Sequence, residues 1–358
     1  MPSIEPKLLY RVELTGASRR RGLQHGRSLK EPIRRAVEFY RQFLGEHLKI
    51  DLAEMRRRAE RFIEPTARMS PLLMSEFEGI ADGCGQRLED LFVITARYEI
   101  TYEQVRLGEC SNLFVGPHRS ASGHTLLGMN WDWRPEVLDF RAVITARCDD
   151  MPDHIVVTEC GQPGKFGVNE HGLAVIETGL ACGQPYSVGQ NLFANLVRHI
   201  LAQPDLEAGR RVAHDHPPEA TVSFFIADSA CGVNVEAASH GLTDRPMGAD
   251  DVCWHTNHCL HSDEPCQFED SIVRGRRWQE LIATAPPRAA IDWQTVGRWL
   301  ADTENGPRAI CKAPDPALAH TTTWLQTLCS TVIAPRDRAL WVSNGLSSRK
   351  PYVRFALS

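Results

Sequence analysis

The residue best suited to covalent chemistry in this chain is a cysteine at the point where predicted helices are followed by short predicted strands. Cys110 comes directly before the short segment at residues 111–115, which predicts a β-strand. A turn containing Gly, Ser and Pro leads to a second predicted strand at residues 125–129, which runs on into Asn130 and Asp132. Pairing of the two strands would place the carboxyl group of Asp132 near the Cys110 sulfur. A cysteine thiolate is a nucleophile, although a lone cysteine beside a strand is more often a buried structural residue.

A histidine cluster offers a different chemistry, that of a metal-dependent hydrolase. His255, His258 and His261 are spaced by three, and three further cysteines surround them, namely Cys253, Cys259 and Cys266. The spacing matches neither paired C-x-x-C nor H-E-x-x-H signatures. If residues 252–258 form a strand, His255 and His258 point to opposite faces. The metal site therefore stays the weaker alternative. No G-x-S-x-G elbow, G-x-G-x-x-G or P-loop motif occurs.

The bulk composition is that of an ordinary globular protein. The chain has 358 residues, a net charge of −5 and 42% hydrophobic residues, which gives no reason to expect a nucleic-acid partner. No segment approaches the roughly 18 apolar residues of a membrane span, and the first residues lack the pattern of a signal peptide. Eleven cysteines, an odd number without paired spacing, favour reduced thiols. We therefore expect a cytoplasmic protein without a membrane partner.

The secondary structure expected before Cys110 differs from that expected after it. Residues 1–109 are expected to be mainly helical, with a capping box from Ser28 to Glu31, an N-cap at Ser70 before Pro71, and a helix at 88–95. Residues 110–358 carry short strands and blocks of helix. Further strands are predicted at 142–147, 155–158, 173–177, 221–226, 232–235, 327–333 and 339–343, and helices at about 192–202, 206–214, 271–283 and 293–300. This order predicts a layered α+β architecture.

Several segments, in order over nearly the whole chain, resemble the acyl-coenzyme A:isopenicillin N acyltransferase family, within the cysteine branch of the N-terminal-nucleophile hydrolases. The matching segments are GASRRRGLQHG at 16–26, EFEGIADGCG at 76–85, Cys110-Ser111, Asn130-Trp131-Asp132, TECG at 158–161 with GVNEHGLA at 167–174, and HTNHCL at 255–260. The resemblance implies a four-layer αββα sandwich over residues 110–358. It also implies self-cleavage between Glu109 and Cys110, with residues 1–109 remaining packed on the core as a small chain.

The resemblance also implies the roles of individual residues. Cys110 would be the nucleophile, and its freed α-amino group, with an ordinary pKa of about 7.7–8.0, would be the base. Asp132 would orient that amino group or bind a polar part of the substrate, and Asn257 would donate an N–H to the oxyanion. Asn130 and Arg274 are candidate substrate-binding residues. Taken alone, Asp132 and Asn257 also fit ordinary turn and strand-end positions.

Two departures from the family pattern affect this assignment. The penicillin-forming member has glycine before the nucleophile, where this chain has Glu109. A different rate of self-cleavage is expected, because glycine relieves crowding in the strained peptide. A late arginine of that enzyme has no secure counterpart near residues 320–324. Arg274 and Arg277 are candidate substitutes, and a solvated helix face is the competing interpretation of both.

The expected activity is attack of the Cys110 thiolate on an amide or thioester carbonyl, followed by release to water or to an amine. The substrate would be a small N-acyl amide or acyl thioester, with an acyl-coenzyme A among the candidates. N-acyl amino acids, β-alanyl amines and small acylated peptides are the candidate classes of amide. Neither a cofactor nor a metal is expected. A relative that binds ligands without catalysis remains a further alternative, and it would keep an uncleaved chain and an unreactive Cys110.

Overall fold

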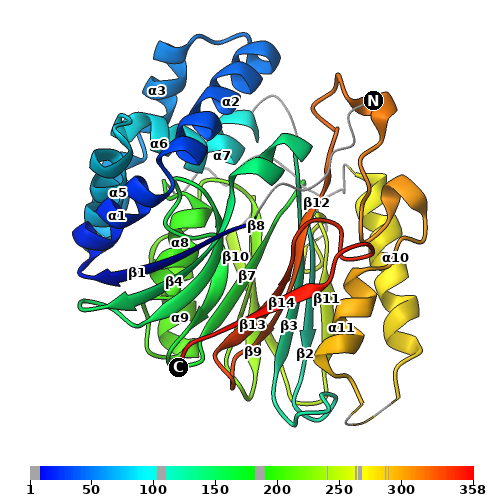
Figure 1. The fold of residues 1–358 in the computed structure, drawn as a ribbon. Helices are drawn as coiled ribbons and strands as arrows, with labels where there is room; N and C mark the ends of the chain where they lie inside the picture. Colours follow the sequence, from blue (N-terminus) through cyan, green and yellow to red (C-terminus); the bar gives the residue numbers. More distant parts are fainter. Residues whose placement is uncertain are drawn as a thin grey trace.

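The computed structural model describes residues 9–102, 110–181, 190–239, 241–262, 264, 268–286, 288 and 290–358. Two β-sheets face each other at the centre of the molecule (Figure 1). The large sheet has the order β1 (Tyr10–Gly16), β4 (Arg141–Cys148), β5 (His154–Glu159), β6 (Phe166–Asn169), β7 (Ala174–Gly179), β8 (Val222–Ala227), β9 (Gly232–Ala238) and β10 (Gly241–Met247). The small sheet has the order β11 (Val252–His255), β2 (Ser111–Val115), β3 (Leu126–Trp133), β12 (Gln326–Ala334), β13 (Ala339–Ser343) and β14 (Tyr352–Ala356).

A helical layer covers the outer face of each sheet (Figure 1). Helices α8 (Phe193–Ile200) and α9 (Leu206–Asp215) pack on the large sheet, and α10 (Glu269–Ala283) and α11 (Trp293–Leu300) pack on the small one. Almost every position of the central strands is buried, as expected for strands covered on both faces. The αββα sandwich is thereby confirmed.

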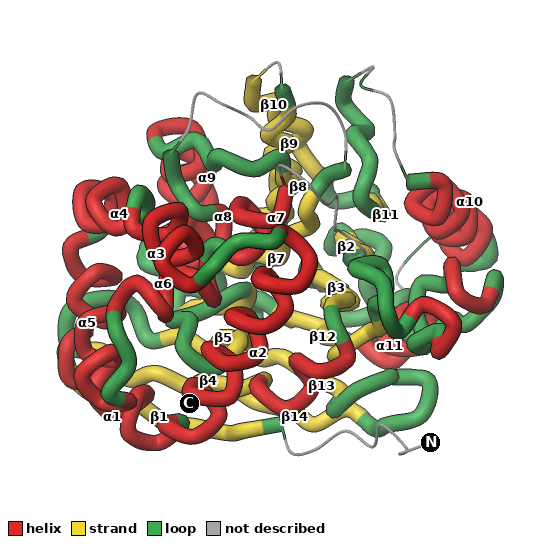
Figure 2. The backbone as a smooth tube through the Cα atoms, turned by 90° about the horizontal axis from the view of Figure 1, so that it is seen from above, coloured by secondary structure: helices red, strands yellow, loops and turns green. Residues whose placement is uncertain are grey.

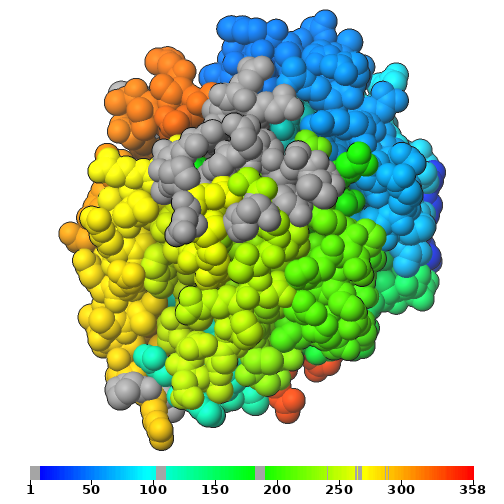
Figure 3. All heavy atoms as spheres, turned by 180° about the vertical axis from the view of Figure 1, so that it is seen from behind, coloured from blue at the N-terminus to red at the C-terminus, as the bar shows by residue number. Residues whose placement is uncertain are grey.

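The N-terminal segment is packed on one end of this sandwich. Its helices are α1 (Ser18–Ser28), α2 (Lys30–Leu48), α3 (Leu52–Glu60), α4 (Ile63–Met69), α5 (Pro71–Cys84), α6 (Leu88–Thr95) and α7 (Arg97–Tyr102). Seen from above, these helices lie in front of the strands of the large sheet (Figure 2). From behind, the blue N-terminal helices meet the green part of the chain without a visible gap (Figure 3). One buried apolar cluster runs through the N-terminal helices and both sheets.

The segment before Cys110, which is expected from the sequence to be mainly helical, also contains the strand β1. It pairs in parallel with β4 at the edge of the large sheet, with Tyr10 opposite Ala142 and Gly16 opposite Cys148. The side chains alternate between partly buried and exposed positions from Tyr10 to Glu13, the period of two that a half-buried strand shows. The N-terminal segment therefore contributes a strand to the sandwich as well as a helical cover.

Helices α1 and α5 approach so closely that glycine is required where they touch. A Cβ atom built on Gly22 would lie 2.0 Å from the carbonyl oxygen of Glu76, and one on Gly79 would lie 2.3 Å from that of Arg19. Gly26 and Gly83 make the corresponding contacts one turn later, at 2.3 and 2.5 Å. These glycines lie in the two N-terminal segments that carry the family resemblance. Their spacing of four residues lets the two helix backbones come together.

Of the two helix starts predicted from capping residues in the N-terminal segment, one is confirmed and one is wrong. The N-cap at Ser70 is confirmed, because its hydroxyl oxygen accepts a hydrogen bond from the Leu73 N–H at 3.3 Å and Pro71 follows. The capping box at Ser28 is wrong, because Ser28 ends α1 and Leu29 caps α2.

Among the described residues, no helix combines the length and the apolar character needed to cross a membrane. Cys259 is disulfide-bonded, so the expectation of reduced thiols fails there, while eight other described cysteines are free.

Candidate active site

Cys110 lies immediately before β2, which runs between β11 and β3 in the small sheet. Its side chain lines a small pocket of about 20 Å³ and is buried. Burial raises the pKa of the Cys110 thiol to about 12, and the nearby carboxylate of Glu177 raises it further, while the ammonium group of Lys165 opposes the change. With the chain intact the sulfur is therefore a thiol at neutral pH, and its attack requires a base to remove the proton.

Asp132 lies beside Cys110 on β3, as the predicted hairpin requires. Strands β2 and β3 are antiparallel, with Ser111 opposite Asn130, and the backbone N–H of Asp132 acts to lower the pKa of the Cys110 thiol. Burial raises the pKa of the Asp132 carboxyl to about 7, although the charge of Arg274 and the hydroxyl of Thr327 oppose the change. Neither carboxyl oxygen has a hydrogen-bond partner of good geometry among the described residues. Such a group is costly to bury unless it gains a partner.

Arg274 connects Cys110 to Asn257. It is completely buried on α10, and its Nη1 donates to the Cys110 carbonyl oxygen at 2.7 Å and to the Ser111 hydroxyl at 3.1 Å. Its Nη2 donates to Oδ1 of Asn257 at 2.7 Å. The interpretation of Arg274 as part of a solvated helix face is therefore wrong. Arg277, the other candidate, bonds to Asp302 at the molecular surface instead.

Asn257 is held by three further hydrogen bonds. Its Nδ2 donates to the Gly179 carbonyl oxygen at 2.7 Å, and its backbone N–H donates to the Ser271 hydroxyl at 2.7 Å. Its own carbonyl accepts from Ala181. Because Arg274 can only donate and the Gly179 carbonyl can only accept, the orientation of the amide is determined. One amide hydrogen of Asn257 is thus committed to a residue of the pocket wall.

Asn130, the other expected substrate-binding residue, is directed elsewhere. Its Nδ2 donates to the carbonyl oxygens of Leu300 and Ile310, at 2.9 and 2.7 Å. Both amide hydrogens therefore fasten the end of α11 and the loop after it to β3. We accordingly leave Asn130 out of the candidate site. Glu109, the other half of the expected cleavage site, lies outside the described residues.

Two buried ion pairs beside Cys110 were missed by sequence reasoning. Lys165 pairs with Glu177 in the pocket wall, and its ammonium group lies 5.5 Å from the ring centre of Trp131. Arg97 of the N-terminal segment also lines the pocket and pairs with Glu159 at 3.2 Å. The sequence did contain one signal for such a pair, namely the charged residue Glu177 within a largely apolar strand. A buried charge is rare unless it is paired. Residues that precede Cys110 in the sequence and residues that follow it thus line the same pocket.

The three histidines of the metal alternative do not converge on one point. The His255 ring binds Glu236 at 2.9 Å, the His258 ring binds the Ser271 hydroxyl at 2.8 Å, and the His261 ring binds the Asn234 amide at 2.9 Å. Among the described residues, no group of three or more His, Cys, Asp and Glu side chains is arranged to hold a metal ion. Cys266 lies outside them. These rings serve as hydrogen-bonding groups.

The chain is similar to a curated protein and, more weakly, to solved structures. The curated "Acyl-coenzyme A:6-aminopenicillanic-acid-acyltransferase 40 kDa form" of Emericella nidulans is 22% identical over 311 residues, which is 85% of each chain. Among solved structures, penicillin V acylase from Agrobacterium tumefaciens matches at 13% identity, over 66% of this chain and 82% of its own, with a TM-score of 0.40. A mutant of conjugated bile acid hydrolase from Clostridium perfringens matches at 12% identity, over 68% and 92%, with a TM-score of 0.43.

The family assignment rests on a match that spans most of the chain. Residues 119–348 match the family described as "AAT: Acyl-coenzyme A:6-aminopenicillanic acid acyl-transferase". The matched region includes Asp132, Asn257 and Arg274 and begins nine residues after Cys110 (119 − 110 = 9). The chain therefore belongs to the acyl-coenzyme A:6-aminopenicillanic acid acyl-transferase family.

Proposed function

We propose that the chain is a self-processing enzyme of the N-terminal-nucleophile type, in which Cys110 becomes the first residue of the larger chain. Acyl transfer is the reaction named in the description of its family, and amide hydrolysis is the same reaction with water as the acceptor. The observation that carries the proposal is the arrangement around Cys110. Arg274 holds the Cys110 carbonyl oxygen and orients Asn257, while the carboxyl group of Asp132, which has no hydrogen-bond partner of good geometry in the described part of the chain, lies beside the sulfur.

The first step is scission of the bond between Glu109 and Cys110. The Cys110 sulfur attacks the Glu109 carbonyl carbon, the C–N bond breaks, and a thioester forms while the nitrogen takes up a proton. Water then attacks the thioester and releases the Glu109 carboxyl group and the Cys110 thiol. The Arg274 hydrogen bond to the Cys110 carbonyl supports this step, because it fixes the peptide that follows the sulfur.

The scission leaves a free amine on Cys110, and Asp132 is suited to receive it. The new amino group carries hydrogen-bond donors and is largely protonated below its ordinary pKa of about 7.7–8.0. The two unpartnered oxygens of Asp132 would accept from this ammonium group, and its positive charge would bring the raised pKa of the carboxyl down again. The burial of an unsatisfied carboxyl group is thus explained by a partner that exists only after cleavage.

In the mature enzyme the unprotonated fraction of this amine acts as the base for its own side chain. It removes the thiol proton, the thiolate attacks the substrate carbonyl, and the remaining N–H of Asn257 stabilises the oxyanion. Collapse of this intermediate expels the amine or thiol of the substrate with the transferred proton and leaves an acyl group on Cys110. Water completes hydrolysis, and an acceptor amine completes transfer. The substrate would be a small N-acyl amide or an acyl thioester such as an acyl-coenzyme A.

The small chain is expected to remain part of the enzyme. Strand β1 is hydrogen-bonded to β4 across the proposed cleavage site, and Glu76 of α5 pairs with the completely buried Arg198 of α8 at 3.1 Å. Arg97 adds a second buried pair with Glu159. These contacts support residues 1–109 and 110–358 as two chains of one folded body.

The test is intact-mass analysis of the purified wild type and of Cys110→Ala. The wild type is expected to give chains of 109 and 249 residues (358 − 109 = 249), the larger with an N-terminal cysteine, and Cys110→Ala is expected to give one undivided chain. Cys84→Ala is the matched control, because Cys84 is also a buried free thiol but lies on α5; it should be cleaved like the wild type. An undivided wild type with full amidase activity would refute the proposal.

Competition between acceptors separates hydrolysis from transfer. With an acyl-coenzyme A as donor, increasing the concentration of an acceptor amine should divert product from the free acid to the amide at a constant rate of donor consumption, if both outcomes share one acyl-enzyme. Cys110→Ala should consume no donor. Free acid as the sole product at every amine concentration would restrict the enzyme to hydrolysis.

A further inference from the structure

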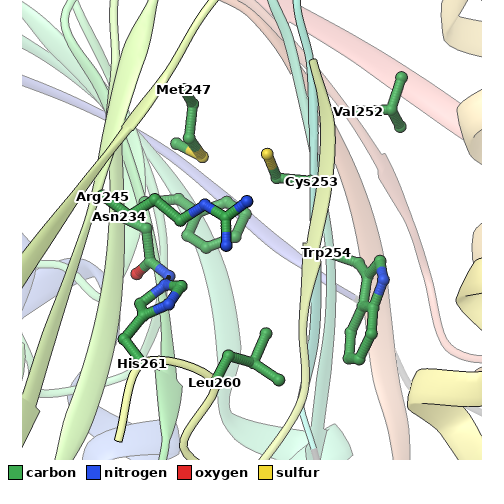
Figure 4. Close-up of a pocket in the computed structure, with 9 residues that line it drawn as sticks. Asn234, Arg245, Met247, Val252, Cys253, Trp254, Leu260 and His261 are labelled. Carbon is green, nitrogen blue, oxygen red and sulfur yellow. Dashed lines mark hydrogen bonds between the residues drawn. The ribbon is translucent and has the colours of Figure 1, made fainter.

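A second cavity lies on the open side of the sandwich, where the edge strands β10 and β11 face each other (Figure 4). Its volume is about 260 Å³, slightly below the usual range of small-molecule sites, so it suits a compact ligand of about ten non-hydrogen atoms. The residues that line it are Phe225, Asn234, Arg245, Met247, Val252, Cys253, Trp254, Leu260 and His261. None of these residues lines the Cys110 pocket.

The floor of this cavity is apolar and the strand pattern explains why. Arg245 and Met247 are two residues apart on β10 and therefore share the face that looks toward β11. Asp244 points the other way, to Arg210 of α9. On β11, Cys253 is directed toward Met247 and Arg245, whereas Trp254 lies on the far side of the strand (Figure 4). Buried Phe225 and Met247 form the floor together with half-buried Leu260.

One unpaired positive charge lies at the rim of the cavity. Arg245 is exposed and has no hydrogen-bond or ion-pair partner within the described part of the chain. The carboxylate of Asp251, the residue before β11, accepts from the Gly248 backbone N–H at 2.7 Å. Arg210 of α9, by contrast, is paired with the carboxylate of Asp244 at 2.7 Å. Arg245 is thus available to an anion.

The other polar groups of the cavity are neutral. The Ser223 hydroxyl donates to Oδ1 of Asn234 at 2.7 Å, and the amide nitrogen of Asn234 lies 2.9 Å from Nε2 of His261. The amide nitrogen can only donate, so His261 accepts at Nε2 and its ring is uncharged. Burial, as the largest cause, lowers the pKa of His261 and raises that of Cys253 to about 11. Arg245 therefore supplies the fixed charge of the cavity.

We propose that this cavity binds a small organic carboxylate with an aromatic or short aliphatic body. The guanidinium group of Arg245 would bind the carboxylate in the two-point geometry that arginine favours. The apolar body would lie on Phe225, Met247 and Leu260, from which it displaces water. The site is separate from the Cys110 pocket, because the two have no lining residue in common.

The test measures binding in the Cys110→Ala protein, so that its result does not depend on cleavage or turnover. Isothermal titration calorimetry with 3-phenylpropanoate should show saturable binding at one site per chain. The neutral analogue 3-phenylpropanamide should bind at least tenfold more weakly, because it lacks the charge that Arg245 pairs with. Arg245→Met should weaken binding of the carboxylate by at least tenfold and leave the amide unaffected.

Two further variants connect the binding to this cavity. Leu260→Trp places an indole ring at the half-buried part of the floor and should abolish binding of both probes, while the buried Phe225 and Met247 are unchanged. Arg354→Met is the matched control, because Arg354 is an exposed arginine on the opposite edge strand of the small sheet, β14; its binding should equal that of the parent. Absence of saturable binding, or equal binding by Arg245→Met and its parent, would overturn the proposal. So would a probe that binds Leu260→Trp as well as it binds the parent.

Discussion

Replacement of Asp132 by asparagine should stabilise the fold at alkaline pH while it removes a residue of the proposed site. The carboxyl group is buried, and neither oxygen has a good hydrogen-bond partner among the described residues. Burial raises its pKa from an ordinary 3.8 to about 7. Asparagine has nearly the same shape and carries no charge, so it removes the cost of ionisation. The comparison is made within the Cys110→Ala background, in which both proteins remain uncleaved and no ammonium group forms beside position 132.

The expected magnitude follows from the shift in pKa. In the unfolded chain Asp132 loses its proton near pH 3.8, whereas in the folded chain it keeps the proton up to about pH 7. The stability that depends on this group is therefore fully present below pH 3.8, decreases as the pH rises through that window, and is lost above about pH 7. A shift of about three pKa units at 1.36 kcal/mol per unit gives a difference of about 4 kcal/mol. Asp132→Asn should avoid that loss.

Urea denaturation at pH 4 and at pH 8.5, followed by circular dichroism, measures this difference. The two proteins should have similar free energies of unfolding at pH 4, and Asp132→Asn should be more stable by about 2–4 kcal/mol at pH 8.5. Asp90→Asn is the matched control with the opposite sign. Asp90 is equally buried, but it accepts two hydrogen bonds from Arg56, at 2.7 and 2.8 Å, so its loss should destabilise the fold by about 1–3 kcal/mol. A stability difference for Asp132→Asn that does not change with pH would refute the reasoning.

Three more substitutions test the site and the helix contact. Asn257→Ala should reduce kcat by about 10²–10³-fold with little change in folding; unchanged turnover in steady-state kinetics would remove Asn257 from the oxyanion role. Arg274→Lys keeps the charge but not the planar fork, so mass spectrometry should find less cleavage after a fixed time, and cleavage at the wild-type rate would contradict the positioning role. Gly79→Ala should destabilise the fold by about 1–3 kcal/mol because its Cβ would lie 2.3 Å from a carbonyl oxygen. Gly45→Ala, whose Cβ would have its nearest contacts at 3.5 Å, should instead be neutral or stabilise by up to about 1 kcal/mol, and equal thermal shifts for the two would count against the close contact.

Several strands and helices after Cys110 followed from local periodicity because each buries a regular face, whereas the four-layer sandwich was implied by the family resemblance. The helix predicted at 293–300 and the strand predicted at 339–343 have the observed bounds of α11 and β13. Strand β1 carries an equally clear alternation, Tyr10, Val12 and Leu14 against charged and polar neighbours, but it stands apart from the other strands in sequence. Its partner β4 begins at Arg141, and no local pattern indicates a pairing over such a separation.

From the sequence, the proximity of two site residues could be predicted only where they lie on neighbouring strands of one hairpin. The proximity of Asp132 to Cys110 follows from one hairpin. The position of Arg274 had a usable signal, because Trp278 lies one helical turn further along the same face of α10, and both side chains are completely buried. Its contact with Cys110 could not be predicted, since 164 residues separate them. The pairing of Lys165 with Glu177 likewise depends on how the strand β7 and the turn before β6 meet in space.

The parallel pairing of β1 with β4 has a consequence for the order in which the protein assembles. The ribosome completes β1 more than a hundred residues before it completes β4, so the polar backbone edge of β1 has no partner during that part of synthesis. Closing so long a loop is entropically slow, as for any contact between distant segments. We therefore expect β1 to pair with β4 late, after β2 has been made. If the chain is cut between residues 109 and 110 as proposed, unfolded protein could regain this pairing only by an encounter of two separate molecules, and its renaturation would depend on concentration.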